Sequence, residues 1–103
     1  KAGIGCIDAF AETPDEHWQR VIGVNLTGTF FCSREAVKLM LKAATPGVII
    51  NISSTAAVTG EGPSHYCAAK AGVMALTRCS ALEAAESGVR INAVAPSIAL
   101  HEF

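Results

Sequence analysis

Charge, aromatic side chains and long apolar runs are all scarce in this chain of 103 residues. Only 17% of the residues are charged and the formal net charge is −1, so no basic surface indicates nucleic acid or an anionic membrane as a partner. Every apolar run is shorter than the roughly 18 residues that a membrane-spanning helix needs. Half of the residues are nevertheless hydrophobic, a share that suits the interior of a larger domain better than a small free one.

Metal-binding and disulfide patterns are also missing. The four cysteines are Cys6, Cys32, Cys67 and Cys79. Their spacing matches neither a C-x-x-C pair nor a zinc site, so we expect free, small, buried side chains in a reducing cytoplasm. The three histidines are His17, His65 and His101. They are expected at the surface, with contact to a substrate as the alternative for His65 and His101, and no metal is predicted.

Hydrophobic spacing predicts elements that alternate between strand and helix. They are the tail of a strand at 2–4, a helix at 14–42, a strand at 48–52, a helix at 64–87 and a strand at 90–94. The run at 48–52 lacks polar alternation, which is typical of a strand buried on both faces. This order predicts an open α/β sheet of parallel strands, a fold that binds ligands at the carboxyl ends of its strands.

Local signals mark the ends of the two long helices. Thr13 is predicted to cap the first helix, with Pro14 at its first position and Glu16 completing a capping box. Ser64 is predicted to cap the second helix, and Gly88 fits a left-handed position after its end.

Two further features concern the interior of these helices. Gly23 and Gly28 bracket Asn25, which predicts a bend or loosened turn there. The second helix is rich in small residues, which permit close approach of the sheet or of a partner helix. They are Ala68, Ala69, Ala71, Gly72 and Ala75.

Tyr66 and Lys70 are the residues that most clearly indicate chemistry. Spaced four apart on the second helix, they lie on one face about a turn from each other. A lysine ammonium near a phenol favours the phenolate, which makes the phenol usable as an acid or a base. Ser53 and Ser54 place hydroxyl groups at the end of the preceding apolar strand.

A set of motifs follows one order along the chain. They are Ala2-Gly3, Asn25 in Val-Asn-Leu-Thr-Gly-Thr-Phe, Ser53-Ser54, Tyr66 with Lys70, and Asn92-Ala93-Val94-Ala95-Pro96. In this order the chain resembles the later half of a short-chain dehydrogenase/reductase, most closely the bacterial 3-oxoacyl reductase-like or steroid-catabolic members. The resemblance implies a Rossmann-like doubly wound parallel sheet, of which residues 1–103 supply strands 4–6 and the intervening helices.

The resemblance implies an NAD(P)-dependent oxidoreductase that interconverts a secondary alcohol and a ketone, such as a 3-oxoacyl thioester or a hydroxysteroid. Tyr66 is then the general acid in reduction and the base in oxidation. Lys70 favours the phenolate and binds the nicotinamide ribose. Asn25 holds a water that links Lys70 to solvent, with the alternative that it only satisfies the bent helix. The implied cofactor-binding residues are Ala2, Gly3, Tyr66, Lys70, Pro96, Ser97 and Ala99.

The serine that orients the substrate carbonyl can be chosen in two ways. Alignment on the strand selects Ser54, whereas counting back from Tyr66 by the family's usual separation selects Ser53. We prefer Ser54, because loops change length more easily than a buried strand changes register. The turn after Pro96 also departs from the family, which usually has glycine where Ser97 stands and isoleucine where Ala99 stands. Serine restricts the backbone more than glycine does.

The family's glycine-rich phosphate loop has no counterpart in this sequence. We therefore expect a partial Rossmann domain that belongs to a polypeptide of roughly 250 residues. The resemblance implies a cytoplasmic homo-oligomer, a dimer or a tetramer, assembled through the two long helices. The alternative is a truncated, non-catalytic fragment that retains only this helix-mediated subunit interface.

Overall fold

The structure is a computed structural model that describes residues 7–44 and 46–96. In chain order its elements are η1 (Phe10–Glu12), α1 (Asp15–Ile22), the π-helical turn η2 (Gly23–Thr27), α2 (Gly28–Ala43), β1 (Gly47–Ile52), α3 (Ala56–Thr59), α4 (Ser64–Ala84), η3 (Ala85–Ser87) and β2 (Val89–Val94). The predicted strand at 2–4 lies outside the described residues, as do the proposed cofactor-binding positions Ala2, Gly3, Ser97 and Ala99.

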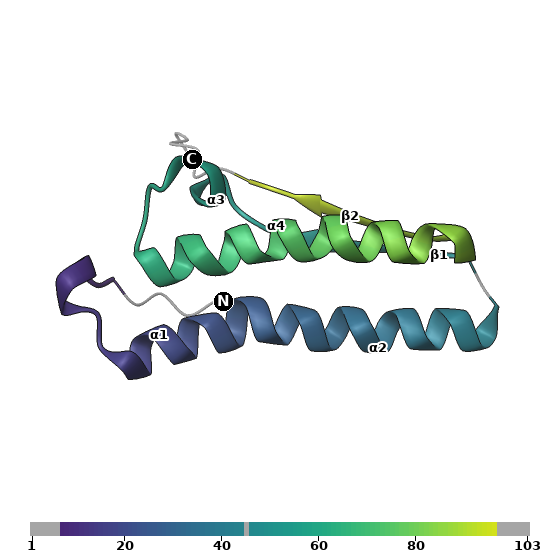
Figure 1. Ribbon diagram of the computed structural model, residues 1–103, viewed down its shortest axis with the longest axis horizontal. Coiled ribbons are helices and arrows are strands. Elements are labelled where there is room, and N and C mark those ends of the chain that lie inside the picture. The colour runs from purple at the N-terminus through teal and green to yellow at the C-terminus, as the bar shows by residue number, and fades with distance from the viewer. Residues whose placement is uncertain (1–6, 45, 97–103) are drawn as a thin grey trace, which may run out of the picture.

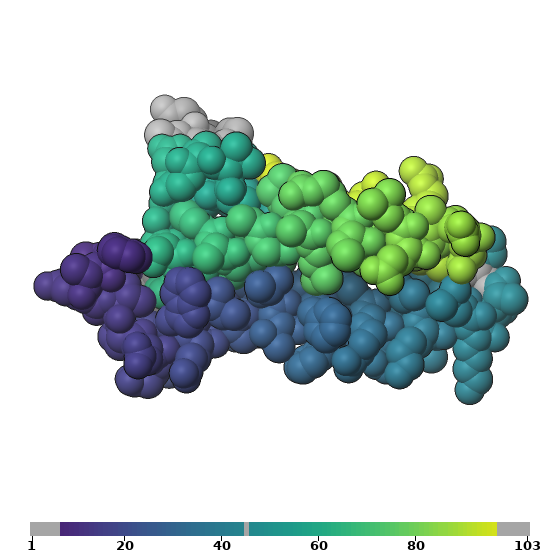
Figure 2. Space-filling model, viewed as in Figure 1, coloured from purple at the N-terminus to yellow at the C-terminus, as the bar shows by residue number. Residues whose placement is uncertain are grey.

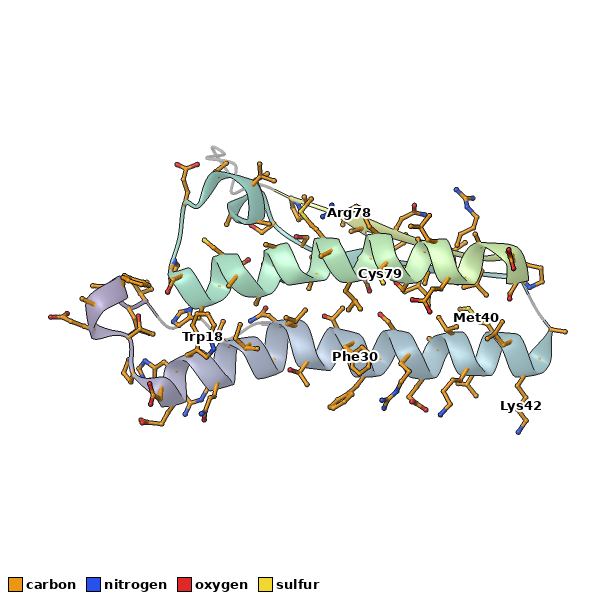
Figure 3. All side chains as sticks on the ribbon, in the orientation of Figure 1. Trp18, Phe30, Met40, Lys42, Arg78 and Cys79 are labelled. Carbon is orange, nitrogen blue, oxygen red and sulfur yellow. The ribbon has the colours of Figure 1, made fainter. Side chains whose placement is uncertain are left out.

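β1 and β2 form a parallel pair in register from Gly47 opposite Val89 to Ile52 opposite Val94. α2 and α4 lie side by side and run in the same direction (Figure 1). The hydrophobic core near the C-terminal ends of α2 and α4 consists of Ala84, Val89 and Ile91, with Met40 packed against them. Met40 lies between α2 and α4 (Figure 3). The predicted strand–helix–strand crossover is confirmed.

The expectation that β1 is buried on both faces is wrong for the described residues. Val48, Ile50 and Ile52 are 54%, 59% and 53% exposed, whereas Asn51 is buried among the helices. Successive side chains of a strand point to opposite faces. The long helices pack on one face of the sheet. Among the described residues, no element packs on the other face, which carries Val48, Ile50 and Ile52.

The sequence predicted a bend or a loosened turn in the first long helix, and the structure has a loosened, π-helical turn there. Helix continues from α1 through α2, and the π-helical turn η2 interrupts it around Asn25. The Asn25 Nδ2 donates to the Val21 carbonyl at 3.1 Å, and the Thr29 hydroxyl donates to the Asn25 carbonyl at 2.9 Å. Single π-turns inside α-helices are frequent at functional sites.

Both predicted helix caps are wrong. α1 has Pro14 at its N-cap and α4 has Pro63, and neither helix has a side-chain capping bond. The Thr13 hydroxyl instead donates back to the Ala9 carbonyl at 3.0 Å, because η1 brings that carbonyl within reach. The prediction for Gly88 is confirmed, since it has a φ of 79° at the end of η3.

Small residues on α4 do permit close packing, as the sequence predicted. A Cβ at Gly72 would lie 2.8 Å and 3.0 Å from the two Cδ atoms of Leu26 in η2. Ala69 and Val73 are completely buried on the same helix. The space-filling view shows the first long helix against α4 along much of its length (Figure 2).

A buried polar network ties α2, β1 and α4 together. The Ser33 hydroxyl donates to the Asn51 Oδ1 at 3.2 Å, and the Asn51 Nδ2 donates to the Thr77 hydroxyl at 3.0 Å. The Thr77 hydroxyl in turn donates to the Val73 carbonyl at 2.7 Å. The network fixes β1 against both helices two residues before the strand-end serines begin.

The cysteines differ from their predicted burial. Cys32 and Cys79 are exposed and Cys67 is partly buried, and all three are free thiols. Cys6 lies outside the described residues. Among the helices of the described chain, none combines the length and apolar character needed to cross a bilayer.

Candidate active site

Tyr66 and Lys70 come together on the first turns of α4, as predicted. The Lys70 Nζ lies over the Tyr66 ring, 5.6 Å from the ring centroid. Both residues are partly buried. A cation at this distance is attracted by the face of the aromatic ring.

Lys70 is joined to the end of β1 by two hydrogen bonds. Its Nζ donates to the Ile52 carbonyl at 3.2 Å, and its own backbone carbonyl accepts from the Ser53 hydroxyl at 2.8 Å. Burial lowers the pKa of the Lys70 ammonium. The side chain thus lies beside the carboxyl end of a strand, the position where open α/β sheets bind ligands.

The two candidate serines have different surroundings. Ser53 is 2% exposed, and its hydroxyl donates to the Lys70 carbonyl. Ser54 is partly exposed, and its Oγ accepts a bond from the Ala56 backbone N–H at 3.2 Å. The Ser53 hydroxyl therefore already donates its proton within the protein. The Ser54 hydroxyl only accepts in its described bond, so its proton is available to another acceptor.

Asn25 is brought to the same region as Lys70. The Asn25 side chain is buried, at 6% exposed. Both residues line a cavity of about 520 Å³ that runs between η2, the start of α2 and β1. Such a cavity, lined by a carboxamide and an ammonium, has the polar partners that ordered water needs.

Pro96 is the first residue of the predicted cofactor loop and lies within the described residues. Its carbonyl accepts from the Thr55 backbone N–H at 3.3 Å, so it lies beside the turn that follows the strand-end serines. The rest of that loop lies outside the described residues.

His65 was expected at the surface and is completely buried, which corrects the sequence prediction. Its Nε2 lies 2.9 Å from an Asp8 carboxylate oxygen. The signal was present in the sequence, because His65, Ala69 and Val73 recur at the four-residue spacing of one helix face. Those residues form the buried stripe of α4. The imidazole is tolerated there because Asp8 accepts its N–H.

A second hollow, of about 440 Å³, lies between α2 and α4 away from Lys70. Phe30 and Leu41 line one side of it and Leu76 lines the other. The Arg34 guanidinium lies 5.1 Å from the Phe30 ring centroid and 5.3 Å from that of Phe31. Phe30 and Phe31 are 40% and 50% exposed.

The strand–helix–strand crossover, with a tyrosine–lysine pair at the end of its strand, defines an α/β protein of Rossmann type. Residues 1–102 match the family model described as short chain dehydrogenase. The chain therefore belongs to the short-chain dehydrogenase family.

Curated relatives include a (5R,7aS)-5-hydroxy-7a-methyl-1-oxo-2,3,5,6,7,7a-hexahydro-1H-indene-carboxyl-CoA reductase of Mycobacterium tuberculosis. It is 52% identical over 103 residues, which are 99% of this chain and 39% of the relative. A 3-oxoacyl-[acyl-carrier-protein] reductase of Synechocystis is 52% identical over 82 residues, which are 79% of this chain and 33% of the relative.

Solved structures agree with this assignment. A short chain dehydrogenase from Mycobacterium smegmatis has a TM-score of 0.90 and 48% identity, covering 96% of this chain and 42% of that one. A short chain dehydrogenase from Leptospira borgpetersenii with bound NAD+ has a TM-score of 0.92 and 31% identity, covering 98% and 42%. This chain spans roughly 40% of the length of these two structures and of the Mycobacterium tuberculosis reductase.

Proposed function

We propose that the protein containing this chain is an NAD(P)-dependent oxidoreductase that interconverts a secondary alcohol and a ketone. The observation that carries the proposal is the placement of Tyr66 and Lys70. The Lys70 Nζ lies 5.6 Å from the Tyr66 ring centroid and donates to the Ile52 carbonyl at the end of β1. The two relatives described above, each 52% identical over the matched residues, are named as reductases.

The side chains at this strand end fit the ribose part of a nicotinamide cofactor, either NAD or NADP. Lys70 has three N–H donors, and the described bond to Ile52 uses one of them. The remaining donors suit the hydroxyl groups of a sugar. When bound, the nicotinamide supplies the redox chemistry, and the protein supplies binding and orientation. With Lys70, we propose Ala2, Gly3, Tyr66, Pro96, Ser97 and Ala99 as cofactor-binding positions.

Tyr66 is the proposed proton donor in reduction and proton acceptor in oxidation. The Ser54 hydroxyl holds the substrate carbonyl oxygen, so that the Tyr66 phenol delivers its proton to that oxygen as negative charge develops there. Lys70 favours the phenolate that remains. Asn25, which lines the same cavity as Lys70, holds a water through which the proton is replaced from solvent.

A carbonyl on an acyl thioester or on a fused-ring ketone is the substrate class that the relatives support. The relatives above are named for an indene-carboxyl-CoA and a 3-oxoacyl-[acyl-carrier-protein]. A further relative, 50% identical over 82 residues and matched over 31% of its length, is a 3beta-hydroxysteroid dehydrogenase of Eggerthella lenta.

The second candidate is assembly through α2 and α4, with or without catalysis. It is favoured by the hollow between these helices and by the exposed aromatic pair Phe30 and Phe31 beside it. An exposed apolar surface of this kind is typical of an interface between proteins. We propose a cytoplasmic dimer or tetramer, and a non-catalytic fragment that keeps this interface is the alternative to the enzyme.

The experiment that tests the first proposal uses the full-length protein. NADH and NADPH are each offered with a 3-oxoacyl thioester and with a 3-ketosteroid, and loss of nicotinamide absorbance is followed. Substrate-dependent oxidation of either cofactor is expected. A folded full-length protein that binds neither cofactor would contradict the enzyme and favour the assembly role, which sedimentation of the same sample measures.

A further inference from the structure

Three titratable side chains from separate parts of the chain meet at one carboxylate. Asp8, which precedes η1, lies 3.0 Å through its Oδ2 from the His17 Nδ1 on α1. The same oxygen lies 2.9 Å from the His65 Nε2 on α4. The Asp8 side chain is 13% exposed, His65 is 1% exposed and His17 is 38% exposed. The carboxylate therefore bridges two helices, with the buried partner on α4.

The surroundings of His65 indicate which of its ring nitrogens donates to Asp8. Its Nδ1 is buried and has no hydrogen-bond partner among the described residues. A proton on that atom would be a buried donor without an acceptor, which is costly. The described contacts therefore favour an Nε2–H that donates to the Asp8 carboxylate. The hydrogen bond from His65 lowers the pKa of Asp8, and the bond from His17 acts in the same direction.

The pair holds a helix end that has no side-chain capping bond. α4 begins at Ser64 with Pro63 at its N-cap and no side-chain capping bond. The first turn of a helix has backbone N–H groups without helical partners and is the part most prone to fray. His65 is the second residue of α4 and Tyr66 is the third, so the bond to Asp8 anchors the very turn that carries the phenol.

We infer that Asp8 and His65 are positioning residues that hold Tyr66 in its working geometry by anchoring the first turn of α4. The inference rests on the proposed role of Tyr66 as the acid and base. A loosened first turn would move the phenol relative to Lys70, which follows one turn later and is fixed separately by its bond to Ile52. Displacement of a catalytic group by about 1 Å can cost roughly 100-fold in rate.

The test compares variants of the full-length enzyme in kcat, KM and the dependence of kcat/KM on pH. Asp8→Ala and His65→Ala are expected to lower kcat by roughly 10- to 100-fold and to change the dependence of kcat/KM on pH. His65→Gln keeps a neutral N–H donor of similar reach and should recover most of the lost kcat. His17→Ala is the matched control, because it removes the other imidazole from the same carboxylate and leaves kcat unchanged.

Tyr66→Phe, measured in parallel, separates the inference from the proposed function. If Tyr66→Phe abolishes turnover while folded Asp8→Ala and His65→Ala keep the wild-type kcat and pH profile, the positioning role alone is overturned. If Tyr66→Phe keeps full turnover, the proposed function fails and the inference fails with it. An equal effect of His17→Ala and His65→Ala would also overturn the positioning role.

A buried imidazole can be needed for folding, so His65→Ala can fail to fold. In that case Asp8→Ala and His65→Gln carry the test, since the first leaves the buried ring in place and the second nearly fills its site. Nitrogen-15 NMR of the imidazole gives an independent readout. A proton on Nε2 is expected, and an Nε2 without a proton would overturn the described bond to Asp8.

Discussion

The Ser53 hydroxyl donates to the backbone carbonyl of Lys70 at 2.8 Å, which joins the residue after β1 to the lysine of the tyrosine–lysine pair on α4. Neighbouring Ser54 has its Oγ at the start of α3 and a more exposed side chain. The two hydroxyls therefore have different partners, and the proposed contact with the substrate falls to Ser54.

Ser54→Ala is predicted to lower kcat far more than Ser53→Ala in the full-length enzyme. Loss of a single donor that meets a developing oxyanion typically costs roughly 100- to 1,000-fold in kcat. Ser53→Ala removes a buried hydrogen bond and is predicted to lower the free energy of unfolding by about 1 kcal/mol. Steady-state kinetics and urea unfolding of both variants check this pair, and the reverse ranking in kcat would assign catalysis to Ser53.

Gly72→Leu is predicted to destabilise the protein by roughly 1–3 kcal/mol through overpacking against Leu26. The reason is the 2.8 Å distance that even a Cβ at Gly72 would have from a Leu26 Cδ. Leu26→Ala made in the same chain should relieve part of the loss. Thermal unfolding of the two single variants and the double variant measures the coupling. Simple addition of the two losses would show that these side chains do not compete for space.

Asn51→Leu is predicted to cost roughly 1–3 kcal/mol of stability. The change leaves the buried Ser33 hydroxyl without the acceptor that it contacts at 3.2 Å. Thr77→Val removes the other partner of Asn51 with little change of shape, and the double variant should lose less than the sum of the single losses. Denaturant unfolding supplies all three values, and strict additivity would mean that the network is not coupled.

The contribution of Asp8 to stability is predicted to be lost in acid. The hydrogen bond from His65 lowers the pKa of Asp8 from its ordinary value of 3.8, so the folded state favours the carboxylate. The resulting stability is fully present above the ordinary pKa and is lost as the pH falls through the lowered folded value. The two histidines are the titratable side chains that contact this carboxylate within the described residues.

Urea unfolding of the wild type and of Asp8→Ala at a series of pH values measures that contribution. The difference in the free energy of unfolding should stay level from about pH 5 to about pH 4 and narrow in more acidic solution. His17→Ala, which keeps the bond from His65, should retain the same narrowing. A difference that remains constant through the acid range would show that the folded state does not favour the Asp8 carboxylate.

The sequence predicted correctly those features that depend on residues close together in the chain. The glycines around Asn25 predicted the interrupted helix, and Gly88 predicted a left-handed end to the second long helix. The four-residue spacing of Tyr66 and Lys70 predicted their contact, because helical geometry alone fixes it.

Features that depend on distant partners were not predicted. Thr13 and Ser64 are residue types that commonly cap helices, yet prolines occupy the N-cap positions of both α1 and α4. The spacing of His65 on the helix indicated a buried face, but its polar partner Asp8 is 57 residues away in the sequence and could not be predicted. The exposed face of β1 depends on which elements cover it, and a run of apolar residues does not contain that information.

The turnover of Tyr66→Phe in the full-length enzyme tests the central claim most directly. The phenylalanine keeps the ring beneath Lys70 and removes only the hydroxyl, and titration with the reduced cofactor reports binding separately from chemistry. We predict that kcat falls by roughly 100- to 10,000-fold, the range for loss of a general acid, while the cofactor Kd stays near that of the wild type. A variant that retains the wild-type kcat would contradict the assignment of Tyr66 as the acid and base.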